Sequence, residues 1–145
     1  SGLYADALAA YDYLAKSGRP VVLYGESLGT SVAVDLATRR PCAGLILEAP
    51  FASGSELAGR VLPLIGPLIF RDYNTIAKID RVSAPMLFIQ GTRDEVVPIA
   101  QGKRLFASVT ARKEFWELPN ADHNTVFESA GPEFAERLRR FYSSL

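Results

Sequence analysis

Three side chains in this sequence have the chemical types and the surroundings that nucleophilic acyl transfer requires. Ser27 lies in the stretch GESLG, residues 25–29, and Asp94 and His123 lie in two polar loops further along the chain. A serine hydroxyl is a weak nucleophile at neutral pH, so it needs a base to take its proton and an acid to orient that base. His123 is the only histidine, and it is therefore the only imidazole base that the chain offers to Ser27.

The residues around Ser27 predict a tight turn between a strand and a helix. The apolar run VVLY, residues 21–24, follows a proline and is typical of a buried strand. Leu28, Val32 and Leu36 then recur at helical spacing. A G-x-S-x-G turn between a strand and a helix lifts the serine Oγ clear of the backbone, which is the arrangement of a nucleophile elbow.

The neighbours of Ser27 carry three further expectations. Side chains at Gly25 and Gly29 would collide where the strand folds back under the helix, so both glycines are expected to be required. The backbone N–H of Leu28, at the start of the helix, is expected to be one oxyanion donor. Glu26 is expected at the rim of a substrate pocket, and an ordinary polar turn residue is the alternative.

Asp94 and His123 each follow a predicted strand. Residues 84–91 (APMLFIQG) and 113–119 (KEFWELP) predict two buried strands, and the two side chains lie in the loops after them. Parallel α/β sheets place their sites at the carboxyl ends of the strands. The chain order Ser27, Asp94, His123 is also one of the known orders of a Ser-acid-His site.

Other carboxylates compete with Asp94 for the role of the acid. Glu95 is its sequence neighbour, and Asp122 adjoins His123, which it could reach only through an awkward local bend. Glu48 ends a further strand predicted over residues 44–48, and it stays open as the alternative acid. The usual chain order favours Asp94.

Strands and helices alternate along the chain, which predicts an α/β fold of about four parallel strands with helices on both faces. We expect one domain over residues 1–145. Residues 51–80 form an apolar insertion broken by prolines and a glycine, and we expect it to be a short helical cap. Leu62, Leu64 and Ile65 would then line a substrate wall. A crossover helix with an irregular start is the alternative.

Composition and charge exclude several classes of protein. Sixteen basic residues balance sixteen acidic ones among the 145 residues, which argues against a nucleic-acid partner. One cysteine and one histidine cannot build a closed zinc site, and we expect neither a metal nor a cofactor. No apolar run reaches the length of about 18 residues that a transmembrane helix needs. The single cysteine fits a reducing compartment such as the cytoplasm, and peripheral association with a membrane is left open.

The stretches LYGESLGTSVAVDLA, LILEAPF, IQGTRDEVVP and ADHNTVFE resemble the α/β-hydrolase superfamily, in particular its small membrane-associated, depalmitoylase-like serine hydrolases. The resemblance spans essentially the whole chain. It implies a serine carboxylesterase in which Ser27 is the nucleophile, Asp94 the acid and His123 the base. A small ester or thioester is the implied substrate. An acyl-protein thioesterase or a lipase-type enzyme is the alternative within the same resemblance.

The resemblance also identifies what this sequence lacks. The full fold has more strands than the four predicted here, and a loop after an early strand supplies its second oxyanion donor, often with a His-Gly sequence. No His-Gly pair occurs in the chain. We therefore expect an N-terminally truncated hydrolase domain with weak activity, whose nucleophile strand is an open sheet edge. Such an edge predicts a homo-oligomer paired strand to strand about a twofold axis, with a non-catalytic fragment as the alternative.

Overall fold

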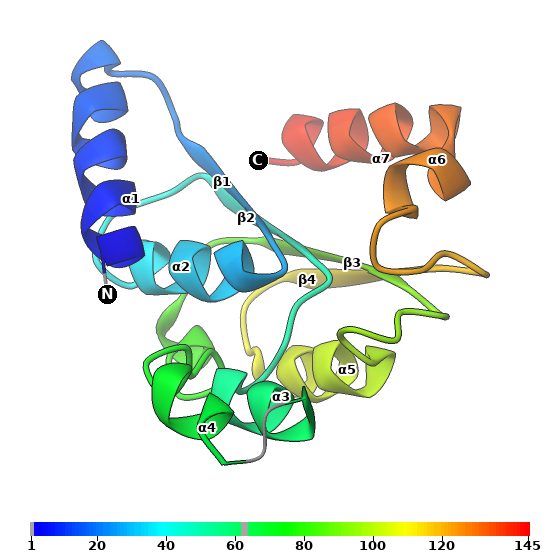
Figure 1. Ribbon diagram of the computed structural model, residues 1–145. Coiled ribbons are helices and arrows are strands. Elements are labelled where there is room, and N and C mark those ends of the chain that lie inside the picture. Colours follow the sequence, from blue (N-terminus) through cyan, green and yellow to red (C-terminus); the bar gives the residue numbers. More distant parts are fainter. Residues whose placement is uncertain (1, 62–63) are drawn as a thin grey trace.

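The computed structural model describes residues 2–61 and 64–145, in which four parallel strands form a sheet with helices on both faces (Figure 1). The strands are β1 (Val22–Glu26), β2 (Gly44–Glu48), β3 (Met86–Gly91) and β4 (Lys113–Leu118). Their order in the sheet is β1-β2-β3-β4, so each strand pairs with the next one along the chain. The predicted α/β class and the parallel sheet of four strands are confirmed.

Burial along each strand follows from its place in the sheet. Every residue of β2 and β3 is buried, because each of these strands has a neighbour on both sides and helices above and below. This explains why both read as continuous apolar runs. In β1 and β4 buried residues alternate with more exposed ones, as expected where one side of the strand has no partner among the described residues.

The helices occupy the segments in which apolar residues recur at helical spacing. They are α1 (Gly2–Leu14), α2 (Leu28–Ala37), α3 (Gly54–Val61), α4 (Gly66–Ile69), α5 (Ile99–Ser108), α6 (Val126–Ala130) and α7 (Pro132–Ser143). The short helix α6 was not predicted, because five residues are too few to show a helical period. Gly131, with a φ of 53°, separates it from α7, which begins at the next residue.

Two apolar layers hold the sheet between the helices. Leu45 on β2 and Phe88 on β3 pack with Leu105 of α5 on one face, where α1 and α2 also lie. The next residue of β2, Ile46, points to the opposite face and packs with Phe134 of α7. Figure 1 shows the same division, with α6 and α7 on one side of the sheet and α2 and α5 on the other.

The segment 51–80 connects β2 to β3 and lies outside the sheet. Its two ends are tied together where Gly54 N donates to Tyr73 O at 2.7 Å. The helix α3 ends at Val61 and α4 begins at Gly66, so the described residues of the segment hold no long helix, in keeping with its prolines and glycines. A Cβ on Gly66 would lie 2.6 Å from the Ala58 carbonyl oxygen, which shows how closely α3 and α4 pack. That this segment caps the site stays a prediction.

A buried carboxylate ties the end of this segment to α1 and α2. Asp35, on α2, pairs at 2.7 Å with both Lys78 Nζ and Arg39 Nε. Lys78 also lies 4.6 Å from the ring centroid of Tyr4 on α1. Burial raises the pKa of Asp35, but the two cations outweigh burial and hold that pKa below its ordinary value. The ion pair therefore fixes residue 78 to the helix that begins beside Ser27.

Candidate active site

Ser27 is the single residue between β1 and α2, and the chain reverses direction there. Its φ of 49° and ψ of −117° are values that a residue with a side chain rarely adopts. The surrounding backbone holds it in this conformation, because Ser27 N donates to Glu48 O at 2.9 Å. Thr30 holds the other side, where its N and Oγ1 donate to Ser27 O at 3.0 and 2.6 Å. The predicted strand-turn-helix is present.

The two glycines of the turn differ, and one of the two expectations about them is wrong. A Cβ on Gly25 would lie 2.4 Å from Gly29 O, so this position excludes any side chain. A Cβ on Gly29 would meet nothing within 4 Å, so the expected collision at Gly29 does not occur. The reason is that Gly25 faces the backbone of the helix, whereas the Cα of Gly29 faces an open groove.

The structure brings Ser27, His123 and Asp94 into one hydrogen-bonded chain. Ser27 Oγ lies 3.1 Å from His123 Nε2, and His123 Nδ1 lies 2.8 Å from Asp94 Oδ2. The side chain of Asp94 has no exposed surface and that of His123 is 14% exposed. This geometry lets Nε2 accept the serine proton while Nδ1–H donates to a buried carboxylate.

The loop after β3 leaves one oxygen of Asp94 for the histidine. Its other oxygen, Oδ1, accepts the backbone N–H of Val96 at 3.0 Å and that of Val97 at 2.7 Å. These two bonds fix the carboxylate in its plane, so Oδ2 is directed at His123.

In the loop after β4, the side chain of Asp122, the other carboxylate considered for the acid, stabilises the turn of the loop itself. Asp122 Oδ1 accepts the backbone N–H groups of Asn124 and Thr125 at 2.8 and 3.0 Å. These hydrogen bonds, that of Asn124 first, lower the pKa of Asp122. Asp122 therefore shapes the turn that carries His123, while Asp94 occupies the position at Nδ1. The other neighbouring acid, Glu95, is exposed on the surface.

Glu48, the alternative acid, lies at the same end of the sheet in a different role. It is buried at the end of β2, and its Oε2 accepts a hydrogen bond from the Tyr24 hydroxyl. Burial is the largest effect and raises the pKa of Glu48 above its ordinary value, although the hydrogen bond from Tyr24 lowers it. The charge of Glu26 raises this pKa and His123 lowers it, both by less. Sequence reasoning did not find the contact with Tyr24, since nothing in the spacing of the two residues indicates it. Asp94, and not Glu48, lies against Nδ1 of His123.

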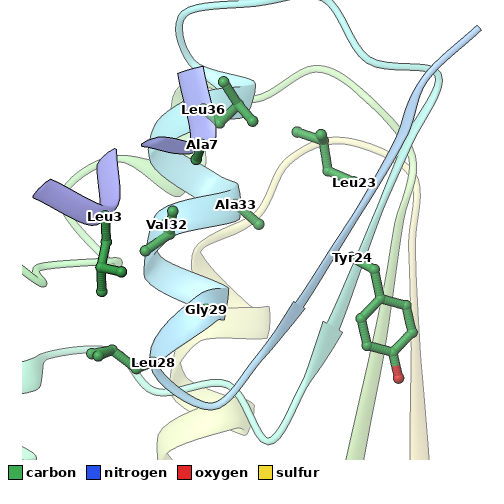
Figure 2. A pocket seen from close by; sticks show the side chains of 9 residues that line it. All are labelled: Leu3, Ala7, Leu23, Tyr24, Leu28, Gly29, Val32, Ala33 and Leu36. Carbon is green, nitrogen blue, oxygen red and sulfur yellow. The ribbon is translucent and has the colours of Figure 1, made fainter. Parts of the chain in front are cut away.

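An apolar groove lies beside the turn and was not predicted. It has a volume of about 350 Å³. Its walls come from α1, β1 and α2, and the lining residues are Leu3, Ala7, Leu23, Tyr24, Leu28, Gly29, Val32, Ala33 and Leu36. Figure 2 shows Leu3 and Val32 between α1 and α2 and Leu23 between β1 and α2, whereas the ring of Tyr24 points to the other side of β1. The signal in the sequence was the apolar stripe on each helix, Leu3 and Ala7 facing Val32 and Leu36.

The remaining predicted substrate-binding residues are exposed or lie outside the described part of the chain. Glu26 is exposed at the end of β1, next to Ser27. Leu64 and Ile65 are 91% and 55% exposed between α3 and α4, and Leu62 lies outside the described residues. A substrate wall made of these residues stays a prediction, as does the oxyanion role of the Leu28 N–H.

The described residues offer neither a metal-binding cluster nor a membrane-spanning helix. Within residues 2–61 and 64–145, no cluster of three or more His, Cys, Asp and Glu side chains is placed to bind a metal ion. In the same part of the chain, no helix combines the length and the apolar character that crossing a membrane requires.

Solved structures share the arrangement of this sheet and its helices. A monoacylglycerol lipase of Paleococcus ferrophilus matches 97% of this chain with a TM-score of 0.77 and 20% identity, over 75% of its own length. An α/β hydrolase enzyme from a lagoon-sediment metagenome matches 98% of this chain with a TM-score of 0.75 and 18% identity, over 70% of its own length. The chain has the α/β-hydrolase fold of these structures, and its sequence is similar to alpha/beta hydrolase domain-containing proteins. No family model matches it.

The sequence relatives of this chain are longer proteins. The human alpha/beta hydrolase domain-containing protein 17C is 35% identical to it over 97% of the chain. The alpha/beta hydrolase domain-containing protein aho-3 of Caenorhabditis elegans is 38% identical over 96% of the chain, and an uncharacterized protein of Mycobacterium tuberculosis is 36% identical over 97%. The chain spans 43%, 42% and 52% of these relatives, about half of their length.

Proposed function

We propose that this α/β hydrolase cleaves carboxylic esters through an acyl-enzyme intermediate. The observation that carries the proposal is the hydrogen-bonded chain from Ser27 Oγ through His123 to the buried Asp94. Structural relatives described as a lipase and as esterases agree with ester chemistry. The resemblance of the sequence to depalmitoylase-like hydrolases makes a thioester the alternative substrate.

In the proposed mechanism, Ser27 Oγ attacks the carbonyl carbon of the ester while its proton passes to His123 Nε2. The tetrahedral intermediate collapses, and the alcohol leaves with the proton from Nε2. A water molecule then gives its proton to Nε2 and attacks the acyl-serine, and the acid product leaves as Ser27 regains its proton. Asp94 holds the Nδ1–H of His123 throughout and stabilises the imidazolium that forms twice per turnover.

Negative charge on the substrate oxygen needs backbone donors. The Leu28 N–H at the start of α2 is the proposed first donor, because N–H groups at a helix start favour anions. The His-Gly pair often found in the loop that supplies the second donor in the superfamily does not occur in this sequence. Loss of one such donor costs about 100- to 1000-fold in turnover, so we expect slow hydrolysis of activated esters.

The open edge of β1 is the proposed partner surface. The Val21 carbonyl and the Ser27 N–H both bond toward β2, so the alternation of the strand turns the backbone groups of Val22, Tyr24 and Glu26 toward the open side. The apolar groove of Figure 2 adjoins this side. We propose that a second copy pairs here, edge to edge about a twofold axis.

Light scattering tests the pairing directly. The parent protein is expected to have the mass of a dimer at micromolar concentration. Leu3, 46% exposed in the groove, gives the matched variant. Leu3→Glu places a charge in the apolar surface and is expected to shift the mass to that of a monomer without unfolding. A monomer mass for the parent protein would reject self-pairing.

Incubation with a fluorophosphonate ester, followed by intact-mass measurement, tests the hydrolase proposal. One adduct is expected on the parent protein and none on Ser27→Ala. Rates with a matched ester and thioester of the same acyl chain then separate the two substrate classes. A folded parent protein that forms no adduct would favour the non-catalytic fragment.

A further inference from the structure

Gln90, near the end of β3, is a fully buried amide with an unusual pattern of hydrogen bonds. Its Nε2 donates to the carbonyl oxygen of Val97 at 2.8 Å. Its Oε1 is buried and has no hydrogen-bond partner among the described residues. A buried acceptor without a partner costs stability, because it has lost its hydrogen bonds to water. An apolar side chain of the same size would avoid that cost.

The helix packed on Gln90 carries a second unfavourable choice. Gly102 lies inside α5, where glycine disfavours the helix. A Cβ at this position would lie 2.0 Å from Gln90 Oε1, so an alanine here would displace the amide. The residue types at two separate positions, Gln90 and Gly102, therefore each cost stability, and together they keep one amide group in its place. That pattern indicates that the amide serves a purpose other than packing.

The bond that Gln90 makes leads directly to the proposed acid. Val97 is held on both sides, since its carbonyl accepts from Gln90 and its N–H donates to Asp94 Oδ1 at 2.7 Å. Asp94 Oδ2 is in turn 2.8 Å from His123 Nδ1. A shift of Val97 would therefore rotate the carboxylate that faces the histidine.

The first half of the loop after β3 is bonded to other segments, so the Gln90 amide holds a different part of this loop. Arg93 N donates to Ala121 O at 2.9 Å and Thr92 N donates to Leu118 O at 3.0 Å, so the first half of the loop is tied to β4 and the turn after it. The second half, around Val97, is the part that the Gln90 amide holds.

We propose that Gln90 is a positioning residue that fixes Asp94 against His123. The inference rests on the proposed function for its effect on turnover, but the Asp94–His123 contact can be observed without turnover. His123 is the only histidine, so its Nδ1 proton gives a single low-field signal in a proton NMR spectrum. A firmly held Nδ1–H···Oδ2 bond slows exchange of that proton with water and keeps the signal visible.

Gln90→Met tests the proposal, since methionine has a similar length and no amide. The expected result is loss of the Nδ1 proton signal and a fall in kcat of about 10- to 100-fold, with KM nearly unchanged. The urea midpoint is expected to stay near that of the parent protein, because the unpartnered Oε1 is removed together with the Nε2 bond. Gln101→Met is the matched control, since Gln101 accepts from Ala52 N at 3.1 Å on α5, away from this loop.

Gly102→Ala displaces the same amide from the opposite side, and it keeps the proposal testable if Gln90→Met does not fold. It is expected to weaken the Nδ1 signal and kcat as Gln90→Met does, while Gln101→Met keeps both. A folded Gln90→Met or Gly102→Ala protein with the Nδ1 signal and kcat of the parent would overturn the proposal. If the parent protein has no hydrolase activity, the NMR signal alone decides, and the failure of the proposed function is recognised separately.

Discussion

The two sides of the candidate site differ in how completely residues of this chain enclose them. On the side of the proposed acid and base, the loops after β3 and β4 are bonded to each other, as where Arg93 N donates to Ala121 O. Asp94 is fully enclosed there, with both of its oxygens in hydrogen bonds. On the side of the nucleophile, Ser27 is held from β2 and α2, but β1 has an open edge beside an apolar groove.

The packing around two glycines, Gly91 and Gly29, shows this difference between the two sides. A Cβ on Gly91, at the end of β3, would lie 2.3 Å from Ala121 O, so the two loops meet with no room for a methyl group. A Cβ on Gly29, beside Ser27, would meet nothing within 4 Å. The side of the site at Asp94 and His123 is therefore closely packed, whereas the side at Ser27 borders an open groove.

The largest effect is expected at the complete side. Asp94→Asn keeps the shape of the side chain but favours the wrong tautomer of His123, so kcat is expected to fall by about 10⁴-fold in ester hydrolysis. Asp122→Asn is the control, because its amide oxygen can still accept from the Asn124 N–H. Equal losses in the two variants would mean that the enclosed Asp94 is not the acid.

An intermediate effect is expected from adding one methyl group to each side. Gly91→Ala is expected to lower the free energy of unfolding by about 1–3 kcal/mol, because backbone must move to admit the Cβ. Gly29→Ala is expected to leave it unchanged or to raise it by up to about 1 kcal/mol, since alanine favours the helix. Urea unfolding of the two variants measures both. A large loss at Gly29 would show that the groove is closed in solution.

The smallest effect is a pH dependence at Glu48, which lies between the two sides. Burial raises its pKa above the ordinary value of 4.5, so the folded protein holds this proton more tightly than the unfolded chain does. The free energy of unfolding therefore falls as the pH rises from that value through the folded pKa. Glu48→Gln cannot ionise and keeps the Tyr24 hydroxyl as a donor. Its stability relative to the parent protein is expected to increase across this pH range in urea titrations, and a constant difference would contradict the assignment.

Local features of this site could be predicted from the sequence better than features that depend on contacts between distant segments. The turn at Ser27 and the loops of Asp94 and His123 were predictable, because a strand, a polar loop and a helix follow one another in the chain. The collision expected at Gly29 was wrong, since it depends on what covers α2 and not on the motif. The bond from Gln90 to Val97 could not be predicted, because a buried glutamine gives no pattern in a single sequence.

The agreement between strand order and chain order has a consequence for how the protein is made. Each strand emerging from a ribosome can add to the edge of the strand made just before it, with no insertion between strands already paired. His123 follows β4, which emerges after the other three described strands, and its loop must reach back across the sheet to Ser27. Ser27 therefore emerges 96 residues before His123, and the hydrogen bond between them can form only when β4 has docked.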